Sequence, residues 1–168
     1  MRSRTAVASV ALVLLVVAGG ALALGTPWVP VPGTDDGEYE WTTVEVVDED
    51  GATLATVRVR VADTTAKRYT GLSETSSLAA DEGMLFVHPS EGEHTYVMRR
   101  MDFPLDIVFV DANGTITTVH HAPVPEETPS EDLVRYSGRG KYVLEVPMGF
   151  TDEHGVDVGD RVLVPDDR

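Results

Sequence analysis

Short apolar runs separated by turn residues predict a domain built mainly of β-strands. In residues 52–62, three valines alternate with Arg58 and Arg60, which is the period of a strand with one buried face. Further runs rich in β-branched and aromatic residues occupy 41–48, 83–88, 94–99, 105–111, 115–120, 142–146 and 161–164. Many short strands with one or two short helices predict a mainly β domain, either a compact β sandwich or a distorted barrel.

Three short segments carry helix signals. Asp63 or Thr64 can cap a helix over 66–69, and Gly71 can end it. A second capped turn is expected over 73–78. Residues 149–154 suit a single helical turn that Gly155 would end.

Residues 83–111 form the centre of the predicted domain, with three apolar runs and a corner that Pro104 fixes. The turn after it, 111–114, ends in Asn-Gly, the strongest short signal for a hairpin. Residues 122–140 contain three prolines and two glycines and show little periodicity, so we expect a long loop there. Loops of this length inside a compact domain are usually functional or mobile.

Residues 5–24 carry no charge and follow Arg2 and Arg4. This length can cross a bilayer, which predicts an N-terminal transmembrane helix with the β domain outside the cell membrane. The alternative is a secretory signal peptide, since the Ala-Leu-Ala at 21–23 would serve as its cleavage site and release a secreted domain. Residues 1–24 are thus an anchor or a signal peptide, 25–40 a linker rich in Pro, Gly and Asp, and 41–168 the β domain.

The acidic composition changes the expected partners. The chain has 28 acidic and 13 basic residues, a formal net charge of −15, and no cysteine. Such a surface repels nucleic acid and acidic membranes. The acidic residues are spread over many loops, which predicts a halophilic protein whose self-repulsion is screened by salt. Thermal melts from low to multimolar salt test this, and unchanged stability would contradict it.

Three stretches carry a family resemblance: RYTGLSETSSLAADEGMLFVHP from 68, YVMRRMDFPLDIVFVDANGTI from 96 and YVLEVPMGFTDEHGVDVGDRV from 142. In this order they resemble the domain-of-unknown-function 192 (DUF192) family. The resemblance implies a compact, mostly β domain with a short helix packed against it, often secreted or membrane-anchored, and no established activity. The chain departs from the family at Val97, where a Trp is common, and at Arg100, where an Asn is usual.

Two carboxylates are candidates for chemistry. Asp106 lies in a run that is apolar on both faces, and a buried carboxylate must be paired, hydrogen-bonded or protonated. Arg68, Arg99 and Arg100 are its candidate partners. Asp106 is then either a structural clamp or, together with Glu145, one of a pair of catalytic acids.

The candidate binding surface is the 122–140 loop with an adjoining groove. The residues that we expect to contact a ligand are Arg68, Tyr96, Met98, Arg100 and Asp106. A soft-metal site such as one for Cu(I) is a further hypothesis, and its candidate ligands are Met84, His88, His94 and Met98. The alternative is that these methionines fill the core. No cofactor is expected, and Asn113 fits an N-glycosylation acceptor.

We therefore expect an extracytoplasmic β domain, tethered to the membrane or secreted, that acts as a ligand-binding or accessory module. The unknown partner is a small molecule or an envelope protein. Two alternatives are a hydrolase-type enzyme that uses Asp106 and Glu145 as acid and base, and a purely structural envelope protein.

Overall fold

A computed structural model describes residues 39–126 and 129–165 of the chain. Its elements are β1 (Glu40–Val47), β2 (Thr53–Ala62), α1 (Thr65–Thr70), β3 (Glu82–Tyr96), β4 (Leu105–Val110), β5 (Ile116–Ala122), the 3-10 turn η1 (Ser130–Asp132), β6 (Tyr136–Pro147), α2 (Phe150–His154) and β7 (Arg161–Leu163). The expected transmembrane helix and most of the linker lie outside these residues. Within the described part, no helix has the length and apolarity that a membrane span requires.

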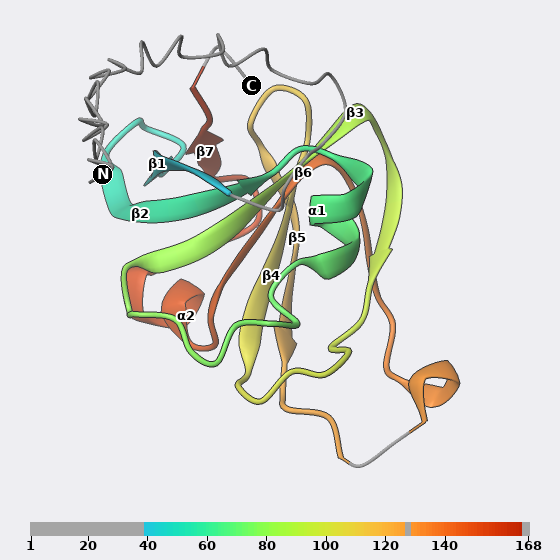
Figure 1. The fold of residues 1–168 in the computed structure, drawn as a ribbon. Coiled ribbons are helices and arrows are strands. Elements are labelled where there is room, and N and C mark those ends of the chain that lie inside the picture. Colours follow the sequence, from blue (N-terminus) through green and yellow to red (C-terminus); the bar gives the residue numbers. More distant parts are fainter. Residues whose placement is uncertain (1–38, 127–128, 166–168) are drawn as a thin grey trace, which may run out of the picture. The chain divides into compact units, whose positions relative to one another are not determined.

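The described strands form one seven-stranded sheet in the order β5-β4-β6-β3-β2-β1-β7 (Figure 1). All neighbours are antiparallel except β2 and β3, which are parallel and joined through α1. The two edge strands approach each other at one end, where Thr115 pairs with Arg161 and the Val162 N–H donates to the Gly114 carbonyl at 2.8 Å. The sheet is therefore a curled half-barrel. The mainly β prediction is confirmed, but a two-sheet sandwich is wrong because all seven strands belong to one sheet.

The sheet separates two hydrophobic clusters. On one face, which we call the α2 face, valines of β1 and β2 pack with Leu85, Leu144 and Phe150, the first residue of α2. On the other, the α1 face, Met84, Phe86 and Leu72 belong to the second cluster, and Leu72 follows α1 closely in the chain. Successive residues of a strand point to opposite faces, so β2 to β6 contribute to both clusters, whereas β1 and β7 contribute only to the cluster on the α2 face.

The local helix and hairpin signals are mostly confirmed. The Thr64 hydroxyl accepts a hydrogen bond from the Lys67 N–H at 3.2 Å, and α1 ends at Gly71 with φ 51°. The turn after β4 has Gly114 at φ 88°, and β4 pairs with β5 as expected. α2 ends at Gly155 as predicted. The capped turn expected over 73–78 is not a helix.

Two strands run further than their sequence patterns indicate. β3 is continuous across the polar stretch 88–93 and changes register between Val87 and Gly92, so the two expected strands are one. β6 begins at Tyr136, so the predicted 122–140 loop ends five residues early. Gly138 is required there, because a Cβ at this position would lie 2.5 Å from the Phe109 ring.

Candidate functional site

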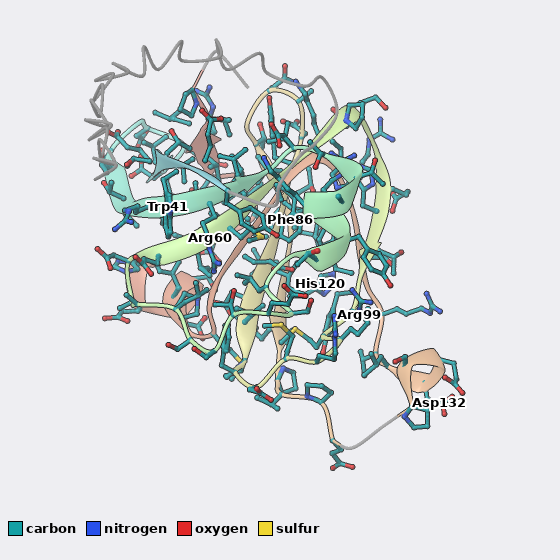
Figure 2. All side chains as sticks on the ribbon, in the orientation of Figure 1. Trp41, Arg60, Phe86, Arg99, His120 and Asp132 are labelled. Atoms are coloured by element: carbon teal, nitrogen blue, oxygen red, sulfur yellow. The ribbon has the colours of Figure 1, made fainter. Side chains whose placement is uncertain are left out.

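A cavity of about 700 Å³ opens on the α1 face, between α1, β3 and the segment that follows β3. Its apolar wall includes Leu72, Phe86, Met98 and Met101. Its polar wall includes Arg68, His88, His94, Tyr96, Arg99 and Glu145. Phe86 and Arg99 are labelled in Figure 2, beside α1. The volume is in the range of small-molecule sites, which usually combine an apolar lining with a few convergent polar groups.

Strand register brings Glu145 to this cavity. In β6, Leu144 and Val146 face the α2 cluster, so Glu145 between them faces the α1 side. Across the sheet Glu145 pairs with Met84 of β3 and with Ile107 of β4, both in the α1-face cluster. Glu145 therefore sits between two apolar neighbours and lines the cavity.

Glu145 is 6% exposed, and no hydrogen bond to its carboxyl group is found among the described residues. Burial raises the pKa of Glu145 to about 8, because a desolvated carboxylate is less stable than the neutral acid. At pH 7 this side chain is therefore mostly the uncharged acid.

Beside Glu145, β3 presents a compact group of three rings. His88 Nε2 and the Tyr96 hydroxyl share a hydrogen bond of 2.9 Å, and the His88 and His94 rings stack with their centroids 3.5 Å apart. Burial, the neighbouring His94 and the charge of Arg68 lower the pKa of His88 to about 4, so its imidazole is neutral at pH 7. Burial and the charge of Glu145 raise the pKa of Tyr96, although Arg68 opposes this. The Nε2 atom of His94 is buried and has no hydrogen-bond partner in the described structure.

Two arginines line the cavity on the side of α1. Arg68 donates to the Val87 carbonyl at 2.8 Å and to the Thr65 hydroxyl at 3.3 Å. Arg99 donates to the hydroxyl and the carbonyl of Tyr69 at 2.8 and 2.7 Å, with its guanidinium 4.2 Å from the Tyr69 ring centroid. Tyr69 is 72% exposed, so this pair lies at the rim while Glu145 lies deep.

Asp106 lies elsewhere, on the α2 face. It is fully buried, and its Oδ1 atom accepts a hydrogen bond from His121 Nδ1 at 2.7 Å. Its Oδ2 atom accepts from the N–H groups of Gly149 and Thr151 at 3.1 and 2.9 Å and from the Thr151 hydroxyl at 2.8 Å. Asp106 therefore caps the N-terminus of α2 from a distant strand, as a structural clamp would.

Three expectations about Asp106 are therefore corrected. Its partners are a histidine and the start of α2, not an arginine. It cannot act with Glu145 as an acid/base pair on one ligand, because the two carboxyl groups face opposite sides of the sheet. Nor does it share a groove with Tyr96 and Met98, since it does not line the cavity on the α1 face.

The other predicted site residues separate into two groups. Arg68, Tyr96 and Met98 line the cavity, as do the candidate metal ligands His88 and His94. Met84, the fourth metal candidate, is fully buried in the adjoining cluster, whereas Arg100 is exposed and outside the cavity lining.

The metal and sugar hypotheses stay predictions. Within 39–126 and 129–165, no group of three or more His, Cys, Asp or Glu side chains could hold a metal ion. That finding does not test a site that uses methionine. Asn113 is exposed in the turn between β4 and β5, where an acceptor would be accessible.

Apart from Arg68, sequence reasoning missed the residues that α1 and the segment after it contribute, and it also missed Phe86. Phe86 lies two residues from both Met84 and His88, so strand periodicity could have placed it on the same face. Nothing in the sequence shows where α1 docks, and so Tyr69 and Leu72 could not have been placed. Part of the predicted loop borders a second cavity of about 400 Å³, and Met98 lines both cavities.

The fold and the cavity together define a mainly β, single-sheet domain with a small-molecule-sized hollow under a short helix. The chain belongs to the DUF192 family, described as Uncharacterized ACR, COG1430, whose profile matches residues 45–164. The resemblance noted from the sequence is therefore confirmed.

Three relatives extend this comparison. A UPF0127 protein of Thermococcus sibiricus is 29% identical over 112 residues, which are 64% of this chain and 66%, just under two thirds, of that protein. A crystal structure from Sinorhizobium meliloti 1021, described as a candidate transcription regulator, is 31% identical with a TM-score of 0.67, over 75% of this chain and 95% of that one. A protein of unknown function from Novosphingobium aromaticivorans is 27% identical with a TM-score of 0.65, over 81% and 90%.

Proposed function

We propose that this protein is an extracytoplasmic module that binds a small molecule in the cavity under α1. The observation that carries the proposal is the buried Glu145 carboxyl group, which lines the cavity and has no hydrogen-bond donor among the described residues. Folded proteins rarely leave a buried polar group unpartnered, and binding sites are a common reason for an exception.

The surroundings of Glu145 support a binding role over a structural one. The cavity has an apolar wall that contains Phe86 and Met98, and polar groups from α1, β3 and β6 converge on it. Such a combination orients a small ligand and excludes water from it. Asp106, on the opposite face, shows what a structural acid does in this fold, because it binds His121 and the start of α2, whereas Glu145 holds no element in place in this way.

A catalytic role has less support. The acid/base alternative needs Asp106 and Glu145 at one ligand, and the sheet lies between them. The description of the Sinorhizobium relative raises DNA binding as another alternative. The net charge of −15 opposes it, because the phosphate backbone is bound through Lys and Arg.

Tethering to the membrane through residues 5–24 is part of the proposal. Its support is the uncharged stretch itself, which is long for a signal peptide. The N-terminal sequence of protein from its native host tests it. A chain that retains residues 5–24 agrees with the tether, and a start near Leu24 or Gly25 indicates a cleaved leader and a secreted domain.

A thermal-shift ligand screen at high salt tests binding, with two matched variants to locate it. Val97 and Val158 are both exposed valines, and Val97 lines the cavity whereas Val158 does not. We expect a true ligand to stabilise the wild type and Val158→Trp, and to stabilise Val97→Trp less. Backbone NMR shifts in α1 and β3 should identify the same site. Ligands that act equally on all three proteins and shift other strands would contradict the proposal.

A further inference from the structure

The two buried acids of this domain differ in one respect. Asp106 accepts hydrogen bonds from His121, from Gly149 and, twice, from Thr151, so both of its carboxylate oxygens are hydrogen-bonded within the chain. Glu145 is almost as buried but has no donor in the described structure. A buried carboxyl group without partners costs free energy unless something outside the chain completes it.

We propose that the ligand of this cavity carries a protonated amine, and that Glu145 binds this amine as a carboxylate. The inference rests on the proposed function, because it specifies the ligand of the same site. An ammonium group has three N–H donors and a positive charge, and an ionised carboxylate is an acceptor with a negative charge. Charge-assisted hydrogen bonds of this kind are about twice as strong as neutral ones.

The apolar wall favours this pairing. Phe86 and Met98 adjoin the cavity and keep the effective dielectric constant low, which strengthens the attraction between opposite charges. The unpartnered Nε2 atom of the cavity-lining His94 is a second polar atom that a ligand can complete. The chain's charge of −15 also raises the local concentration of cations over anions.

The two arginines limit which amines fit. The N–H groups of Arg68 are directed at the chain itself, and those of Arg99 at Tyr69 near the rim. Their charges disfavour a cation near α1, whereas the pKa of Glu145 in β6 is set by burial and is not lowered by either arginine. The site therefore selects a ligand whose amine reaches the depth of the cavity and whose remainder, apolar or anionic, lies toward the rim.

Binding of an amine must release a proton near neutral pH. In the free protein the raised pKa of Glu145, about 8, keeps it protonated, and an ammonium group stabilises only the ionised form. The titratable groups that share the cavity are Arg68, Tyr69, His88, His94, Tyr96 and Arg99. His88 is neutral and Tyr96 protonated at pH 7, so neither supplies a competing positive or negative charge. Below pH 8, the affinity for the amine should therefore increase about tenfold for each unit by which the pH is raised.

Three probes of equal chain length test the inference on the full chain: n-butylammonium, n-butanol and butyrate. Binding is followed by NMR titration and by calorimetry in buffers of different ionisation enthalpy. We expect n-butylammonium to bind at least about tenfold more tightly than the other two, with nearly one proton released at pH 6 to 7. The ¹³C shift of the Glu145 carboxyl group should report its ionisation on binding.

Glu145→Gln and Glu153→Gln are the matched variants, since Glu153 is an exposed acid on α2. We expect Glu145→Gln to weaken n-butylammonium binding at least about tenfold and to abolish the proton release, and Glu153→Gln to change neither. Equal or tighter binding of butanol or butyrate overturns the amine inference but leaves the cavity a binding site. Failure of all three probes also overturns it, whereas the proposed function is judged by the ligand screen. If Glu145→Gln does not fold, the carboxyl shift in the wild type decides alone.

Discussion

Asp106 and Glu145 stand on neighbouring strands, yet their carboxyl groups lie on opposite faces of the sheet. Glu145 pairs with Ile107, and Asp106 pairs with Val146, so a difference of one position in the register separates the two acids. On the α2 face Asp106 has four hydrogen bonds, and on the α1 face Glu145 has none among the described residues. Asp106 therefore stabilises the fold, whereas Glu145 faces the cavity.

Asp106→Ala should destabilise the domain strongly. The substitution removes the hydrogen-bond acceptor of His121 in β5 and of the Gly149 and Thr151 N–H groups at the start of α2. Breaking a buried pair of this kind costs about 3–5 kcal/mol, and we expect the free energy of unfolding to fall by that amount. Denaturant unfolding at constant high salt measures it. Glu153→Gln, on the exposed side of α2, should stay within about 0.5 kcal/mol of the wild type. A loss below about 1 kcal/mol for Asp106→Ala would contradict the clamp.

His121 should titrate above the usual range of histidine. Its hydrogen bond to Asp106 raises the pKa most, burial lowers it by a smaller amount, and the charges of Asp106 and Asp152 raise it further. Because the folded-state pKa is raised, the stability that His121 contributes is fully present below its unfolded pKa of about 6.5 and is lost as pH rises through the folded value. NMR titration of the imidazole measures this. In Asp106→Asn the pKa should fall toward 6.5, and an unchanged value would contradict the pairing.

The elements that local chemistry determines could be predicted from the sequence. Thr64 and Gly71 bound α1 because a hydroxyl cap and a left-handed glycine are local requirements. The turn that ends at Gly114 follows from the same kind of rule. The fold class needed only the spacing of the apolar runs.

The long strands and the single sheet could not be predicted, because they depend on contacts between distant segments. Gly138 looks like a loop residue in the sequence, and only the ring of Phe109 above it explains a glycine within a strand. Strand register is likewise non-local. The alternation of each strand can be read from the sequence, but not which face of β4 matches which face of β6. Whether Asp106 and Glu145 share a face is therefore left open by the sequence.

The candidate site was predicted in part for the same reason. Arg68, Tyr96 and Met98 lie near the apolar centre of the chain, and they line one cavity. Arg100 and Asp106 are close to Tyr96 and Met98 in sequence, but Arg100 is exposed outside the lining and Asp106 faces α2. Proximity along the chain is therefore a poor guide to which side of a sheet a residue occupies.

Arg100→Gly should stabilise the domain. Arg100 is exposed and has φ 55°, in the left-handed region that a side chain with a Cβ adopts at a cost and glycine adopts freely. The free energy of unfolding should increase by about 1 kcal/mol, and denaturant unfolding measures this change. Arg100→Ala is the control, because alanine keeps the strain and should give no gain. Equal stabilities of the glycine and alanine variants would contradict this explanation.

Glu145 should make the folded protein less stable as pH rises toward 8. Its pKa is raised from 4.5 to about 8 by burial, so between these values the folded state holds a proton that the unfolded state has lost. The free energy of unfolding therefore falls with pH in this window, by a few kcal/mol in total, since each pKa unit is worth about 1.4 kcal/mol. Denaturant unfolding from pH 4 to 9 in Glu145→Gln should lack this component, while Glu153→Gln should keep it. If the wild type and Glu145→Gln differ by the same amount at every pH, Glu145 does not hold its proton in the folded state.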